Sequence, residues 1–243
     1  MRSRRVFGMG LLGVLLWGFV WLWAKDPALA QPPPRDVGLI TAVSGEVQYQ
    51  GYGQAMGLAE PFMKVRLGDR FDLAKEASLQ IVFFQGSRQE LWRGPVSFKA
   101  GEAQGEPLGG GAGAVEVKVL PAGTGQGIQR VPTLLRRAGL SRVGGMQVRG
   151  SGSRAQEGER PAPTLSQEEK AELQAARETY KVMREKASAE DLTPELFFLG
   201  VLSEYEQYEE MSSLLKEALS KDPGNELLKN LAGWVKTQAD KPR

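Results

Sequence analysis

The chain has 243 residues, with 31 Lys or Arg and 29 Asp or Glu, and it contains neither His nor Cys. This composition excludes a Ser-His-Asp triad, a Cys nucleophile, zinc held by nitrogen or sulfur ligands, and haem held by His or Cys. It also excludes disulfides and a lipid-modified N-terminal Cys. Carboxylate chemistry is the class that remains open.

The first 30 residues have the pattern of an export signal. Three arginines precede an uncharged apolar run at 6–24, and Ala28-Leu29-Ala30 offers small residues at the positions that signal peptidase reads. We therefore expect a periplasmic or secreted chain that begins at Gln31. The apolar run is also almost long enough to span a bilayer, so an uncleaved inner-membrane anchor is the alternative. Under that alternative, residues 6–24 are the only membrane contact.

The charge of the exported part gives no reason to expect nucleic-acid binding. Residues 1–30 hold four basic residues and one acidic residue, which leaves 27 basic and 28 acidic residues in the remainder. The charges are unevenly placed, with seven arginines in 121–160 and 16 acidic residues in 165–243. An acidic or cell-wall polymer is one candidate partner for the basic stretch at 130–149, whose role stays open.

The spacing of Pro, Gly and apolar residues predicts an α+β protein with several domains. Short alternating apolar runs separated by glycine turns indicate strands, and apolar residues at helical spacing follow after Thr164. The predicted order is an export signal or membrane anchor at 1–30, a Pro-rich spacer at 31–36, a mainly antiparallel β domain at 37–149, a flexible linker at 150–164 and a helical domain at 165–243.

The β region is expected to form a sandwich or a barrel. Its first two runs, at 39–43 and 47–49, flank a Ser44-Gly45 turn and predict a hairpin. The valines of 115–119 predict a late strand. A short helix is expected at 132–138.

Residues 37–100 resemble the periplasmic domain of ferric-citrate regulator (FecR) proteins. The resemblance rests on a Gly-Glu-Val turn, a Gly-Asp pair before a strand, and a strand followed by Gly-Ser. It implies structural turn roles for five residues, namely Gly45, Gly68, Asp69, Gly86 and Ser87. Regulators of that family bind a sigma factor through a cytoplasmic segment, and only five residues precede the apolar run in this sequence. Transmembrane signalling is therefore our third hypothesis.

The region after Thr164 predicts four helices in antiparallel hairpins. Ser166 and Glu169 form a capping box, Thr193-Pro194 begins a second helix, a third spans about 208–220, and Asn225 begins the fourth. The segment resembles a degenerate tetratricopeptide repeat at seven positions, namely Leu199, Gly200, Tyr208, Leu215, Ala218, Pro223 and Asn225. Such a repeat implies protein binding.

Aromatic residues of the helical region exceed what four helices in two hairpins are expected to enclose. We expect Phe197 or Tyr205 to be partly exposed beside the acidic residues Glu209 and Glu210, as a protein-binding site. The alternative is that these aromatics pack against the β domain of the same chain.

Adjacent carboxylates occur at 168–169, 190–191 and 209–210, and we expect all of them to face solvent. We therefore predict no enzyme, no cofactor and no metal site. The favoured function is a non-enzymatic binding or scaffolding protein of a Gram-negative cell envelope, with envelope proteins as partners. The alternative is a polysaccharide or peptidoglycan binder that uses exposed aromatics such as Tyr49, Tyr52 and Trp92.

Overall fold

The computed structural model of the chain describes residues 34–51, 54–109, 114–140, 142–143, 146–147 and 165–241, without the side chains of 142–147. The predicted export signal, the linker at 150–164 and Tyr52 lie outside these residues. Among the described residues, no helix combines the length and the apolar character needed to cross a bilayer.

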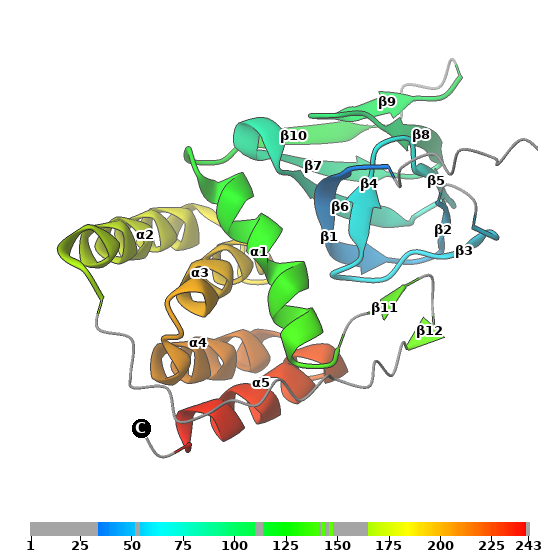
Figure 1. Cartoon of the computed structure of the whole chain (residues 1–243). Coiled ribbons are helices and arrows are strands. Elements are labelled where there is room, and N and C mark those ends of the chain that lie inside the picture. Colours follow the sequence, from blue (N-terminus) through cyan, green and yellow to red (C-terminus); the bar gives the residue numbers. More distant parts are fainter. Residues whose placement is uncertain are drawn as a thin grey trace, which may run out of the picture. The chain divides into compact units, whose positions relative to one another are not determined.

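In the part of the chain that the structure describes, ten strands form two five-stranded antiparallel sheets (Figure 1). The first sheet has the order β10 (Val115–Val119), β7 (Arg88–Arg93), β6 (Ser78–Phe83), β1 (Asp36–Ser44), β4 (Lys64–Arg66). The second sheet has the order β3 (Gly57–Leu58), β2 (Val47–Gln50), β5 (Arg70–Leu73), β8 (Val96–Ala100), β9 (Gly105–Pro107). Two further short strands, β11 (Arg142–Val143) and β12 (Met146–Gln147), pair with each other.

The two sheets share an apolar core. Leu79, Ile81 and Phe83 alternate along β6 and belong to the same buried cluster as Phe71 and Phe98 of the second sheet. Trp92 of β7 stacks on Phe98 at 4.1 Å between ring centroids. The alternation of apolar residues therefore predicted the buried faces correctly, and the antiparallel β region of the expected α+β fold is confirmed.

The hairpin expected at Ser44-Gly45 is wrong. β1 pairs with β4 and β6 in the first sheet, whereas β2 pairs with β3 and β5 in the second. Gly45 has a φ of 72° and carries the chain from one sheet to the other. A hairpin would leave the apolar faces of both strands side by side in one sheet, whereas the crossing lets them bury each other.

Within the described ranges, five helices accompany the sheets. They are α1 (Thr124–Arg137), α2 (Gln167–Lys186), α3 (Thr193–Glu204), α4 (Tyr208–Lys221) and α5 (Glu226–Ala239). Leu39 of β1 and Val82 of β6 point away from the sandwich core and share a second buried cluster with the helices. The first sheet is thus covered on one face by the second sheet and on the other by helices (Figure 1).

Helix α1 is longer than the sequence predicts and begins at Thr124 rather than at 132. The glycine-rich sequence of its first turns is typical of a loop. In the structure, the Gly125 N–H donates to the Ser87 side-chain oxygen at 2.9 Å, and this bond holds the start of the helix against the first sheet. Although α1 lies within the range assigned to the β domain, it packs along α3, and Figure 1 shows it between the sheets and the other helices.

The local signals for the remaining helices agree with the structure. The Ser166 hydroxyl accepts from the Glu169 N–H, and the Glu169 carboxylate accepts from the Ser166 N–H, which confirms the capping box. Asn225 caps α5 by accepting from the Leu228 N–H at 3.1 Å. Thr193 is the first residue of α3 rather than its cap.

Candidate functional site

The outer edge of β10 is the most distinctive open feature of the described structure. β10 pairs with β7 and, among the described strands, with no other. The Leu120 N–H donates to the Ser87 carbonyl, and the Arg93 N–H donates to the Ala114 carbonyl. Because backbone direction alternates along an antiparallel strand, Glu116 and Lys118 also bond toward β7. The N–H and C=O groups of the odd-numbered valines therefore point outward.

The three odd-numbered side chains of this strand are apolar, which is unusual for an open edge. Val115 is 38% exposed, Val117 is 41% exposed and Val119 is 76% exposed. An uncovered edge strand with β-branched residues is a template for pairing with another strand. The edge thus combines free backbone groups with apolar side chains that gain from being covered.

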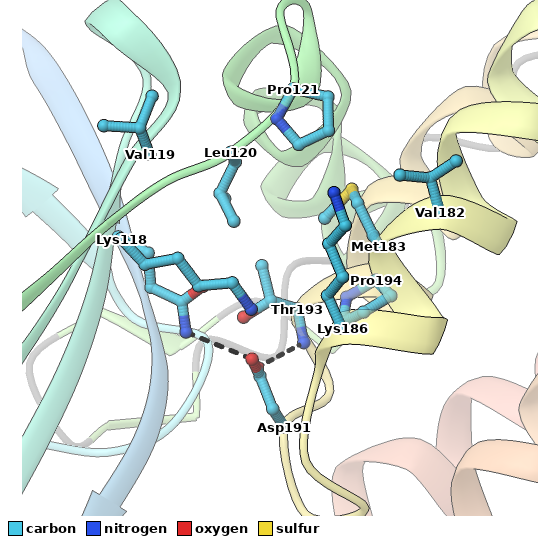
Figure 2. A pocket seen from close by; sticks show the side chains of 11 residues that line it. Lys118, Val119, Leu120, Pro121, Val182, Met183, Lys186, Asp191, Thr193 and Pro194 are labelled. Atoms are coloured by element: carbon cyan, nitrogen blue, oxygen red, sulfur yellow. Dashed lines mark hydrogen bonds between the residues drawn. The ribbon is translucent and has the colours of Figure 1, made fainter.

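A pocket of about 270 Å³ lies beside this edge, between the first sheet and the start of α3 and end of α2. Its apolar lining comes from residues of β10, the following loop, α2 and α3, namely Val119, Leu120, Pro121, Val182, Met183 and Pro194. Figure 2 shows Lys118 entering this space from the sheet and Lys186 entering it from α2.

The floor of the pocket is a hydrogen-bonded joint between sheet and helices. The Asp191 carboxylate accepts from the Thr193 N–H at 3.0 Å and from the Gln89 amide at 3.2 Å (Figure 2). It also accepts from the Gln80 amide of β6 at 3.0 Å. Burial alone would raise the pKa of Asp191, but these donors outweigh it and hold the pKa below its ordinary value. Asp191 is therefore an ionised and satisfied acceptor rather than a proton donor.

Three polar groups at the pocket can still accept or donate a hydrogen bond or form an ion pair. The side-chain ammonium groups of Lys118 and Lys186 make no ion pair or hydrogen bond within the described part of the chain, and the buried Gln89 side-chain oxygen has no hydrogen-bond donor there. Two ammonium groups over an apolar lining suit a carboxylate carried on an apolar chain. Over the described ranges, no group of three or more acidic side chains is placed to hold a metal ion.

The expected partial exposure of Phe197, in α3, or of Tyr205, which directly follows α3, is wrong. Phe197 is 4% exposed and Tyr205 is 7% exposed. The ring of Phe197 packs against Gly127 of α1, so the first part of α1, which the sequence did not predict, covers it. Burial and the neighbouring Glu172 carboxylate raise the pKa of Tyr205 to about 12. Neither aromatic offers an open contact surface.

The two acidic residues of the same predicted site lie in the first turn of α4, where the helix dipole favours negative charge. Glu210 forms a bidentate ion pair with Arg177 of α2, whose Nε and Nη2 atoms donate to the two carboxylate oxygens at 2.9 and 2.7 Å. Glu209 is exposed. Because Phe197 and Tyr205 are buried, the predicted pairing of an exposed ring of either residue with Glu209 and Glu210 does not form.

The residues of the FecR-like motif lie at turns of the sandwich. Gly45, Gly68 and Gly86 have φ values of 72°, 89° and 78°, in the left-handed region that favours glycine. Asp69 is buried and accepts from the Arg66 N–H at 2.8 Å and from the Tyr49 hydroxyl at 3.1 Å. Ser87 holds the start of α1, a role that the sequence did not suggest.

Two of the three aromatics considered for sugar binding are buried. Tyr49 donates its hydroxyl to Asp69, and the Trp92 indole donates to the buried Glu90 carboxylate at 2.9 Å. Both therefore serve the sandwich core, and the expectation of exposed rings at these positions is wrong.

Sequence reasoning found the β10 strand but missed the pocket beside it. Asp191 was expected to face solvent with Glu190, whereas it joins three donors from the sheet and α3. An Asp two residues before the first turn of a helix is a local signal for its bond to Thr193. No local signal brings Lys118 and Lys186 together, because 68 residues separate them in the sequence.

The site thus consists of an open strand edge and an adjoining pocket with two free ammonium groups. The chain matches no protein-family model, no curated protein and no solved structure.

Proposed function

We propose that the protein is a non-enzymatic binding and scaffolding module of a bacterial cell envelope, and that it holds its partner by strand addition at the outer edge of β10. The observation that carries this proposal is the set of outward backbone groups of β10, which bond to no other described strand. Main-chain bonds supply affinity in such pairing, and side chains alongside supply selectivity.

The packing around β10 should hold this edge strand rigidly in place. β10 continues a sheet that is packed on both faces, and the Asp191 joint fixes the helices against that sheet. The envelope location is supported by the export pattern at 1–30, and the FecR-like order of turns at 37–100 agrees with it. We further propose that residues 165–243 act as a tetratricopeptide-like helical scaffold in a multidomain chain.

The substitution Val117→Pro tests the proposal. Proline removes one outward N–H, whereas the bonds of Glu116 and Lys118 to β7 remain, and proline is tolerated on edge strands. Wild-type protein should retain its partner from an envelope extract, and the Val117→Pro variant should lose it.

Val117→Thr is the matched control, because threonine keeps the N–H group and the branched shape. It should retain the partner. Amide exchange at residues 115, 117 and 119 should slow when the partner is bound. Retention of the same proteins by wild type and by Val117→Pro would contradict strand addition.

A further inference from the structure

The sequence of β10 is self-complementary when the strand is turned around. It reads Val-Glu-Val-Lys-Val, with Val117 at its centre and opposite charges on either side. In a two-fold interface, residue i contacts residue j and j contacts i. A strand with an acidic residue before its centre and a basic residue after it can therefore satisfy both charges by pairing with its own copy.

The direction of the backbone allows this pairing. The outward groups belong to Val115, Val117 and Val119, so a second β10 must set its own odd-numbered valines against them. With Val117 opposite Val117, the partner's Glu116 stands directly opposite Lys118. Directly opposed side chains lie on the same face, with Cβ atoms about 4.5–5.5 Å apart.

The charges also select the register. A shift of two residues in one direction sets Glu116 opposite the partner's Glu116, and a shift in the other direction sets Lys118 opposite the partner's Lys118. Like charges directly opposite each other destabilise strand pairing. A lysine on an edge strand usually opposes pairing, but in the register centred on Val117 it meets a carboxylate.

Both charged residues are available within the described structure. Lys118 has no ion pair there, and Glu116 has a single long one, 3.8 Å from Arg93, with both side chains more than half exposed. Such exposed pairs contribute little. Lys118 lies on the pocket side of the sheet, opposite Gln89, so the partner's Glu116 would also approach Lys186 at the mouth of the pocket.

We infer that the strand bound at this edge is β10 of a second copy of this chain, paired antiparallel about Val117, with Glu116 of each copy against Lys118 and Lys186 of the other. This inference rests on the proposed function, because it names the partner for the same edge. The product is a sheet that continues across two copies, with the helices of both on one face.

Charge reversal tests the inference on the full chain. Sedimentation velocity over a concentration series should show the wild-type mass rising toward twice that of one chain. Glu116→Lys and Lys118→Glu should each stay monomeric, because each sets like charges opposite each other. The double variant should dimerise again, less tightly than wild type because Lys186 then faces a cation, and an equal mixture of the two single variants should form a heterodimer.

A matched control is available on the other sheet. Lys99 and Glu106 are also an exposed cross-strand pair, and Glu106 lies on the edge strand β9. Reversing both charges there should leave the mass of the dimer unchanged. Circular dichroism and thermal midpoints should show that all variants remain folded.

The outcomes separate this inference from the proposed function. Self-pairing is overturned if the wild-type chain stays monomeric at every concentration. It is also overturned if the single charge reversals leave the dimer unchanged. Failure of both the double variant and the mixture to recover the dimer also overturns it. If an extract protein is nevertheless retained and lost with Val117→Pro, strand addition stands with a different partner. If neither self-pairing nor retention depends on Val117, both proposals fail.

Discussion

Gly200 of α3 lies directly against the backbone of Gly127 of α1. A methyl group added at Gly200 would sit 1.9 Å from the Gly127 carbonyl oxygen, and one added at Gly127 would sit 2.5 Å from the ring of Phe197. The two helices therefore cross at the distance of their backbones. This crossing buries Phe197 and fixes the helices that cover the first sheet.

We expect Gly200→Ala to destabilise the protein, because the clash is with backbone and cannot be relieved by a side-chain rotation. The loss in free energy of unfolding should be about 1–3 kcal/mol or more, measured by urea titration. Gly233→Ala in α5 is the control, since nothing lies within 4 Å of its added methyl group. That change should stabilise by about 0.5–1 kcal/mol. Equal effects at both positions would contradict the close crossing.

Phe197→Ala should cost about 3–5 kcal/mol, because it empties a fully packed position. For a chain of this size the thermal midpoint should fall by roughly 10 °C, at about 2–4 °C per kcal/mol. Val182→Ala on α2 removes a side chain that is 42% exposed and should change stability by less than about 0.5 kcal/mol. A small loss of stability on Phe197→Ala would instead support the exposed protein-binding role that the sequence predicts for this residue.

Two ion-paired glutamates of the helical region should differ sharply in their contribution to the free energy of unfolding. Glu195 is buried and bonded to Arg184 of α2 and Lys221 of α4, so Glu195→Gln leaves two cations with a weaker acceptor. We expect a loss of about 3–5 kcal/mol. Glu210→Gln weakens a partly exposed pair with Arg177 and should cost about 0–1 kcal/mol. Chemical unfolding of both variants at neutral pH checks the contrast.

Asp191 should link stability to acid pH. Its folded pKa lies below its unfolded value of about 3.9, so its stabilisation is present above that value and is lost as the pH falls through the folded pKa. Asp191→Asn should cost about 1–3 kcal/mol at neutral pH, and the difference from wild type should shrink below about pH 4. Unfolding titrations across this pH range measure it. Glu190→Gln, at an exposed neighbour, should change the free energy of unfolding at neutral pH by less than about 0.5 kcal/mol.

The export pattern predicts a mature chain that begins at Gln31 and is released by osmotic shock. Intact-mass analysis of the protein purified from its host checks the cleavage site after Ala30. A mass that includes Met1, with the protein in the membrane fraction, would support the anchor alternative.

Features that depend on neighbouring residues could be predicted from the sequence. The capping box of α2, the Asn225 cap and the alternation along β6 involve residues within a few positions of each other. Their hydrogen bonds and periodicity are local, so the α+β class and the four C-terminal helices could be predicted correctly. The glycine-rich start of α1 could not, because helix propensity argued for a loop and only packing against α3 and Ser87 overrides it.

The sequence by itself determined which residues form most strands and helices, which side of each is apolar, and which catalytic chemistries lack their residues. The tertiary structure alone decided that β1 and β2 enter different sheets, that Phe197 is covered by α1, and that β10 is an edge strand of the first sheet as far as the chain is described. It also brought Lys118 and Lys186 to one pocket. These properties depend on contacts between residues far apart in the chain, and such contacts leave no periodic or local signal in the sequence.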